Sequence, residues 1–204
     1  MLVLFLILLL AIIAFFKTDV KDKFIKPKYE DVIKSDIDYD SDGLDDYTDI
    51  LNGAKDFINE KPKYKSKYYD GGYPTDEYRV CTDIIWYALK NAGYDFKTLI
   101  DEDIKNNKDE YDEDVGDTNI DFRRVRNIKV YLDRNALKLA NDSDFNPGDI
   151  VVYKKHIAIV SDKVNSKNEN YILHQHMYQA YEYDGLFKNE ILGHYRWRLN
   201  DGKE

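Results

Sequence analysis

Hydrophobic positions divide the chain into a helical first part and a strand-rich final part. Apolar residues recur at helical intervals over 50–58 and over 81–92, and Gly93 is placed to end the second helix. Similar spacing predicts helices over 97–107 and 124–136. After the turn at 146–149, short stretches rich in β-branched and aromatic residues predict strands within 149–153, 156–162, 170–183 and 190–199.

Helices followed by strands predict an α+β domain with an antiparallel sheet. A chain of 204 residues is long enough for one well-buried domain and short for two. We expect that domain over residues 36–204, after a charged linker at 17–35 that is rich in lysine and aspartate.

Residues 1–16 hold no charged side chain, which is typical of an export signal or a membrane anchor. A helix of that length covers about 24 Å, less than the roughly 30 Å of a hydrocarbon core. A small-residue pattern ending at Ala14 is typical of a processing site, but Phe15 and Phe16 follow it. We expect an extracytoplasmic protein, either secreted or tethered to a membrane through this segment if it is not cleaved.

The net charge argues against one class of function, and the single cysteine is a candidate catalytic residue. A net charge of -9 argues against non-specific nucleic-acid binding, which requires a basic surface. The single cysteine, Cys81, has no partner for an internal disulfide and lies where a helix is predicted to start. A helix N-terminus together with an imidazolium can lower the pKa of a thiol to about 3.5–7.5. Cys81 is therefore a candidate nucleophile, and the alternative is a small buried apolar group.

The histidines cluster in the strand-rich part of the chain. They are His156, His174, His176 and His194. Side-chain alternation places His174 and His176 on one face of their strand and Gln175 on the other. We expect one sheet face to present several imidazoles to a helix lying across it.

These features resemble the NlpC-type cell-wall peptidases, a papain-like superfamily with a Tyr-x-x-Gly-Gly motif, a cysteine at a helix start, a Pro-Gly-Asp turn and two strand histidines. The counterparts in this chain are Tyr68, Gly71, Gly72, Cys81, Thr82, Asp83, Pro147, Gly148, Asp149, His156, Leu173 and His174. The stretches "GGYP", "VCTD", "NAGYD", "NIDFRRV" and "GHYRW" more closely resemble an exported bacterial branch known as a domain of unknown function. The resemblance covers residues 45–198.

The resemblance implies a papain-like fold, with N-terminal helices and the nucleophile helix packed on a C-terminal antiparallel sheet. It implies that Cys81 is the nucleophile, that His156 accepts the thiol proton and that His174 orients His156. The Cys81 N–H and Tyr68 would form the oxyanion hole. The implied reaction is hydrolysis of an amide bond through a thioester, with peptidoglycan stem peptides as the expected substrate and no organic cofactor.

Three further residues are candidate substrate-binding groups. Asp83 stands where the superfamily has a small residue, and its carboxylate would raise the pKa of the thiol or bind a substrate amine. His176 is a second candidate for the orienting role, and Gln175 becomes one if the strand register shifts by one residue.

Two other functions stay open at this stage. Three or four of the histidines could bind zinc and give a hydrolase that does not need Cys81, although no metal-binding helix motif supports this. The same fold could also be a non-catalytic, calcium-binding module of the cell surface.

The acidic stretch at 36–49, which opens the domain, matches a calcium-binding loop like that of dockerin modules. Its ligand positions are Asp38, Asp40, Asp42, Leu44 through its backbone carbonyl, Asp46 and Asp49. Gly43 occupies the turn position, and Asp49 replaces the usual glutamate at the last one. We expect a structural Ca²⁺, and the alternative is a solvated acidic run that caps the next helix.

Overall fold

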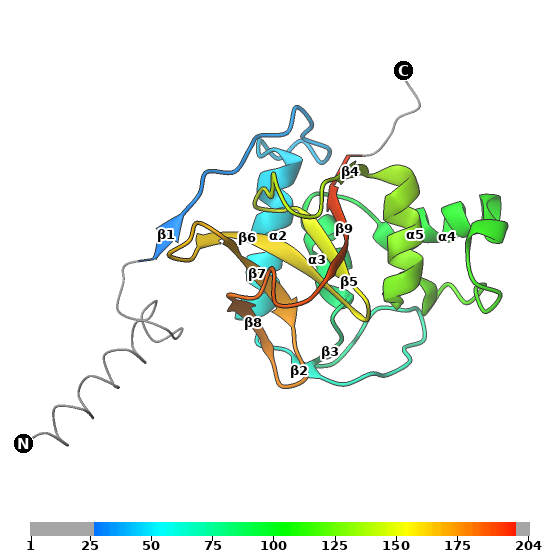
Figure 1. The fold of residues 1–204 in the computed structure, drawn as a ribbon. Helices are drawn as coiled ribbons and strands as arrows, with labels where there is room; N and C mark the ends of the chain where they lie inside the picture. Colours follow the sequence, from blue (N-terminus) through cyan, green and yellow to red (C-terminus); the bar gives the residue numbers. More distant parts are fainter. Residues whose placement is uncertain (1–26, 199–204) are drawn as a thin grey trace, which may run out of the picture.

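The computed structural model describes residues 27–198. It is an α+β fold in which four α-helices pack with an antiparallel sheet, so the predicted class is confirmed (Figure 1). Within 27–198, no helix is long and apolar enough to cross a membrane. The predicted signal or anchor segment at 1–16 lies outside the described residues.

The helices follow the predicted pattern closely. They are α2 (Asp46–Asn59), α3 (Asp83–Asn91), α4 (Phe96–Asn106) and α5 (Val125–Asn135), with short 3-10 helices at Lys108–Glu110 and Asp121–Arg123. Asp45 caps α2 by accepting a hydrogen bond from the Thr48 N–H, and Asp95 caps α4 in the same way. Gly93, with φ of 81°, follows α3 as its position in the sequence predicted.

The main sheet has the strand order β4-β9-β5-β6-β7-β8, with neighbouring strands antiparallel and β1 added to β6. The strands are β1 (Lys28–Tyr29), β4 (Leu137–Leu139), β5 (Ile150–Tyr153), β6 (His156–Val164), β7 (Asn170–Gln175), β8 (Ala180–Tyr183) and β9 (Ile191–Arg196). A separate parallel pair joins β2 (Lys63–Tyr64) to β3 (Tyr78–Arg79). This pair lies close to the end of the main sheet that carries β8 (Figure 1).

The sheet buries apolar side chains on both faces. On one face, Ile157, Ile159 and Leu173 belong to the main core with residues of α2 and α3. On the other, Ala158 and Ile172 belong to a second cluster that is covered by loop residues such as Leu186. The alternation along β6 and β7 therefore decides which side chains reach the helices.

Two predicted boundaries need correction. Part of the predicted linker at 17–35 is attached to the domain, because β1 pairs with β6 and the Ile33 N–H donates to Asn146 Oδ1 at 2.8 Å. The stretch at 170–183 forms two strands, β7 and β8, because the residues between them turn the chain back.

Candidate active site

Cys81 lies in the turn directly before α3 and is half-buried. The turn is held by backbone hydrogen bonds from Asp83 N to Val80 O at 3.0 Å and from Ile85 N to Thr82 O at 3.1 Å. The Thr82 hydroxyl donates to the Arg123 carbonyl at 2.9 Å. The helix predicted from residue 81 thus begins at Asp83, and Cys81 stays at its N-terminal end as expected.

Two histidines from neighbouring strands contact each other beside this thiol. His156 Nε2 lies 2.8 Å from His174 Nδ1. Both rings and Cys81 line one cavity of about 420 Å³. His174 is 4% exposed and stacks on Tyr183, with the ring centroids 5.6 Å apart. The structure therefore brings together the three residues predicted to act as nucleophile, base and orienting group.

The position of the thiol relative to the sheet differs from the prediction. By alternation, His156 and His174 share the face of Ala158 and Ile172, which is opposite to the face packed against α2 and α3. Cys81 therefore meets the imidazoles at the end of the sheet where β6 begins, and the helix does not lie across the histidine face. No hydrogen bond joins Cys81 Sγ to His156 among residues 27–198.

Burial sets the protonation of all three groups. It raises the pKa of the Cys81 thiol to about 11; the Ile157 backbone N–H acts in the opposite direction, and the Asp83 charge adds to the increase. Burial, and after it the charges of neighbouring histidines, lowers the pKa of His156 to about 4 and that of His174 to about 3. A thiolate stabilised by the helix end was expected. The resting site instead holds a neutral thiol and neutral imidazoles, because desolvation penalises every charged form.

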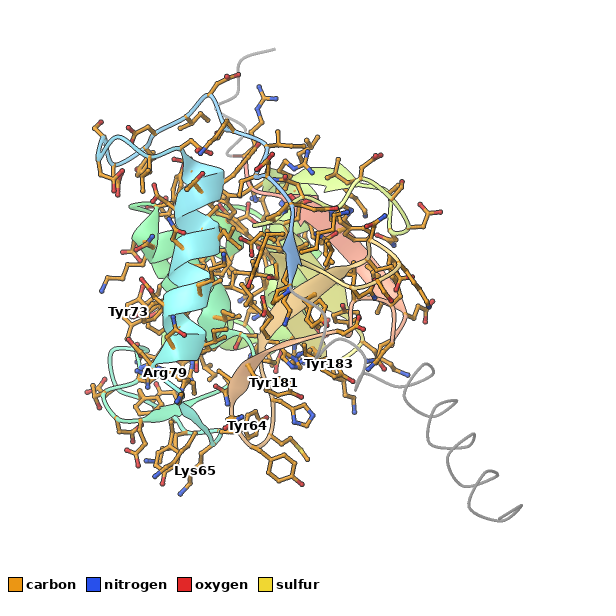
Figure 2. The ribbon with its side chains drawn as sticks, turned by 90° about the vertical axis from the view of Figure 1, so that its left-hand side faces the viewer. Tyr64, Lys65, Tyr73, Arg79, Tyr181 and Tyr183 are labelled. Carbon is orange, nitrogen blue, oxygen red and sulfur yellow. The ribbon has the colours of Figure 1, made fainter. Side chains whose placement is uncertain are left out.

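The cavity has an aromatic lining that the sequence did not point to. Tyr64 from β2 and Tyr181 and Tyr183 from β8 lie at the same end of the molecule, as Figure 2 shows. Burial, and after it the nearby Cys81, raises the pKa of Tyr64. The pattern "AYEY" places Tyr181 and Tyr183 on one face, which is a usable signal. Tyr64 carries no such signal, because it sits in a strand of two residues.

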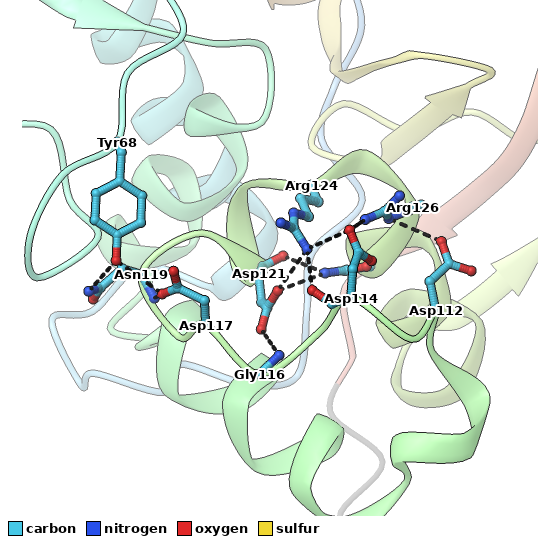
Figure 3. A network of polar contacts seen from close by, with 10 residues as sticks. Tyr68, Asp112, Asp114, Gly116, Asp117, Asn119, Asp121, Arg124 and Arg126 are labelled. Atoms are coloured by element: carbon cyan, nitrogen blue, oxygen red, sulfur yellow. Dashed lines mark hydrogen bonds and ion pairs between the residues drawn. The ribbon is translucent and has the colours of Figure 1, made fainter.

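Tyr68 was predicted to complete the oxyanion hole, and this is wrong. Its side chain is 59% exposed and lies outside the lining of the cavity. The hydroxyl donates to Asp117 Oδ1 at 3.2 Å and accepts from Asn119 Nδ2 at 3.1 Å, as Figure 3 shows. The turn that follows Tyr68 packs against Asn119 and Phe122 at Gly72, whereas Tyr64 shares the lining of the cavity with Cys81.

Asp83 was considered as a substrate-binding group, and this is also wrong. Its carboxylate is fully buried and forms a bidentate ion pair with Arg123, at 2.7 and 2.9 Å. It also accepts hydrogen bonds from the Trp86 indole and the Val80 N–H. Asp83 therefore holds the turn that carries Cys81, and a substrate amine cannot reach it.

Gln175 and His176 both line the cavity, but Gln175 is buried and His176 is half-buried. Gln175 is 1% exposed, and its Nε2 donates to the carbonyls of Pro62 and His176, at 3.3 and 2.9 Å. It thus fixes the segment that leads to Tyr64, and the register shift that would make it an orienting group does not occur. His176 lines the cavity, with its ring centroid 5.8 Å from that of His174.

The histidines do not form a zinc site. His156 and His174 bond directly to each other, and His194 lies in a separate buried group, 2.7 Å from the Ala140 carbonyl and 2.8 Å from Asp149 Oδ2. Across the described part of the chain, the group of three potential ligands with ligand atoms within 4.8 Å of one another is Asp38, Asp40 and Asp42. His194 contacts Ala140 and Asp149 and lies outside the lining of the cavity.

The acidic loop has the internal hydrogen bonds of a tight, organised turn. Asp38 accepts from the N–H groups of Asp42 at 3.2 Å and Gly43 at 3.0 Å, and Asp42 accepts from the Leu44 N–H at 2.8 Å. Gly43 has φ of 98°, a conformation that favours glycine. The loop directly precedes α2, whereas Tyr64, which lines the cavity, follows the C-terminal end of that helix in the chain.

Two predicted ligands at the start of α2 differ sharply. Asp46 is buried, and its two oxygens accept hydrogen bonds from the Tyr39 N–H and the Tyr94 hydroxyl, so we remove it from the predicted ligand set. Asp49 is 2% exposed, and its Oδ2 has no hydrogen-bond partner among the described residues. Burial raises the pKa of Asp49 to about 6, with further contributions from Asp42 and Asp40.

Comparisons with known proteins place the chain in a family. A family model described as "Domain of unknown function (DUF1287)" matches residues 51–197, and the chain belongs to this family. The chain is similar to the uncharacterized protein YijF of Escherichia coli (strain K12), with 32% identity over 164 residues, covering 72% of this chain and 80% of the relative. No solved structure matches the chain. The expected membership in a domain of unknown function is confirmed.

Proposed function

We propose that this protein is a cysteine hydrolase that cleaves an amide bond through a thioester on Cys81. The observation that carries the proposal is the 2.8 Å contact between His156 Nε2 and His174 Nδ1, beside a cysteine in the same cavity. With Nε2 engaged by His174, Nδ1 of His156 is the nitrogen left to accept the thiol proton. The motif resemblance to the papain-like peptidases supports the same assignment.

The proposed reaction needs no preformed thiolate. Because the thiol and both imidazoles are neutral at rest, His156 takes the proton as Sγ attacks the carbonyl carbon. The tetrahedral oxyanion is stabilised by the Cys81 N–H and the Tyr64 hydroxyl. The C–N bond then breaks, the amine leaves with the proton from His156, and water hydrolyses the thioester to release the acid and the thiol.

The lining of the cavity favours a substrate that carries a carboxylate. Among its described lining residues, Lys155 holds the one permanent charge, and no aspartate or glutamate is present. Aromatic side chains supply most of the remaining wall. A peptidoglycan stem peptide has amide bonds and free carboxylates, and we propose this substrate class for an exported protein, secreted or tethered through residues 1–16.

A second candidate function is a non-catalytic surface module. Two observations favour it: no hydrogen bond joins Cys81 to His156 within residues 27–198, and burial raises the pKa of the thiol. In that case the cavity would bind a ligand without cleaving it.

Digestion of purified peptidoglycan, with products identified by mass spectrometry, tests the proposal. We expect new amines and carboxyl groups with the wild type and none with Cys81→Ala. Tyr64→Phe should slow product formation about tenfold or more, since one oxyanion donor is lost. Tyr68→Phe is the matched control and should leave the rate unchanged. Equal products from the wild type and Cys81→Ala would overturn the assignment, and binding without products would favour the module.

A further inference from the structure

A buried carboxylate without a partner faces a cluster of three exposed ones at the N-terminal end of α2. The carboxylate oxygens of Asp38, Asp40 and Asp42 lie within 4.8 Å of one another. Asp49, one turn into the helix, is 98% removed from solvent, and its Oδ2 has no hydrogen-bond partner in the described structure. A buried anion next to other anions is strongly unfavourable unless a cation compensates the charge.

We propose a calcium site whose ligands are Asp38, Asp40, Asp42, the backbone carbonyl of Leu44, and Asp49. Carboxylate and carbonyl oxygens at alternating loop positions, closed by an acidic residue at the twelfth, suit Ca²⁺, which takes six to eight oxygen ligands. Mg²⁺ is less suited, because it requires near-ideal octahedral geometry and dehydrates reluctantly. The site is independent of the proposed hydrolysis.

Contacts with the rest of the domain hold the loop in place. Tyr39 stacks on Tyr94, with ring centroids 4.1 Å apart, and Tyr94 in turn bonds to Asp46. A Cβ at Gly93 would lie 2.7 Å from the Asp40 Cβ, so glycine permits the loop to approach the connection between α3 and α4. Because these contacts restrict the loop, little additional conformational entropy would be lost when it binds an ion.

Asp46 has a different part in this site from the one its loop position suggests. Its oxygens accept hydrogen bonds from the Tyr39 N–H and the Tyr94 hydroxyl, so it anchors the loop. The ninth loop position commonly coordinates through water, which leaves room for this arrangement. The ion would therefore connect the exposed loop to the first turns of α2 through Asp49. Residues 38–44 and Asp49 precede the 51–197 segment that matches the family.

Calorimetric titration of the full chain with CaCl₂, combined with thermal melting in EDTA and in calcium, tests the site. We expect one ion per chain with a Kd on the order of 0.1–1 mM, and a Tm increase of about 3–10 °C in 10 mM calcium. Magnesium at the same concentration should give less than half of that shift. No calcium heat, or equal shifts with both ions, would overturn the proposal.

Three variants separate a binding role from a structural one. Asp40→Asn, at an exposed position, should weaken calcium binding at least tenfold without changing the Tm in EDTA. Asp49→Asn should also weaken binding at least tenfold, while its Tm in EDTA stays equal or rises, because an uncompensated buried charge is removed. Asp36→Asn is the matched control, with the same charge change just before the first ligand position, Asp38. Wild-type binding by Asp49→Asn, or equal weakening by Asp36→Asn, would contradict the site.

Discussion

Asp49 and His174 each carry one buried polar atom without a hydrogen-bond partner within residues 27–198, and the surroundings of these two atoms differ. In the lining of the cavity, the His174 ring packs against Tyr181 and Tyr183. At the N-terminal end of α2, Asp49 Oδ2 lies beside the acidic loop.

An unpartnered imidazole nitrogen and an unpartnered carboxylate oxygen have different energetic consequences. When one polar atom of a buried neutral imidazole lacks a partner, the folded state is destabilised by about 1–3 kcal/mol. The aromatic neighbours hold the ring in one orientation. A buried carboxylate among other carboxylates is more unfavourable than this, because its negative charge also lacks a compensating positive charge. The surroundings of His174 favour a positioning role in catalysis, and those of Asp49 favour a cation-binding site.

Histidine substitutions should have the largest effect, and they should change the rate of cleavage without changing the calcium affinity. His156→Gln removes the proposed base and should lower the rate of peptidoglycan cleavage by about 10² to 10⁴-fold. His174→Phe keeps the aromatic packing, removes the contact with His156 and should lower the rate about 10²-fold. Calorimetry should give the wild-type calcium affinity for both. A His156→Gln protein with the wild-type rate would exclude the assigned base.

Substitution of the two buried aspartates should affect the melting temperature differently. Asp83→Asn leaves Arg123 as an uncompensated buried charge and should destabilise the fold by about 3–5 kcal/mol, a Tm decrease of roughly 10 °C. Asp49→Asn removes an uncompensated charge and should not lower the Tm measured in EDTA. Comparable decreases in both variants would contradict the distinction between a paired and an unpaired carboxylate.

Thiol reactivity should show the neutral resting site directly. Because burial raises the pKa of Cys81 to about 11, the thiol is protonated at neutral pH. Its alkylation rate by iodoacetamide should rise about tenfold for each pH unit between 7 and 10. The same chain unfolded in urea should titrate near the ordinary value, roughly 8.5. A plateau below pH 9 in the folded protein would instead indicate a thiolate–imidazolium pair.

The helices and longer strands were largely predictable because their hydrophobic residues recur at the spacing typical of each element. The helical spacing at Ile50 and Leu51 and the β-branched run at 150–153 gave α2 and β5 nearly in full. Two-residue strands such as β1 and β2 carry no period, so the attachment of residues 28–29 to β6 was missed.

The candidate site was predictable where a motif and a secondary-structure element coincide. Cys81 before a helix, and His156 and His174 on adjacent strands, were placed correctly. The assignment of Tyr68 to the oxyanion hole failed because a spacing motif cannot show which way a loop turns. The role of Asp83 was missed because its partner, Arg123, lies 40 residues away and only tertiary packing brings them together.

Covalent trapping tests the central claim most directly. The wild type is mixed with a peptidoglycan stem peptide, quenched in acid within milliseconds to seconds, and measured by intact-protein mass spectrometry. We predict a mass increase equal to the acyl part of the peptide, located on Cys81 by peptide mapping and absent from Cys81→Ala. Cleavage products that form without any adduct, and at the same rate in Cys81→Ala, would contradict the account.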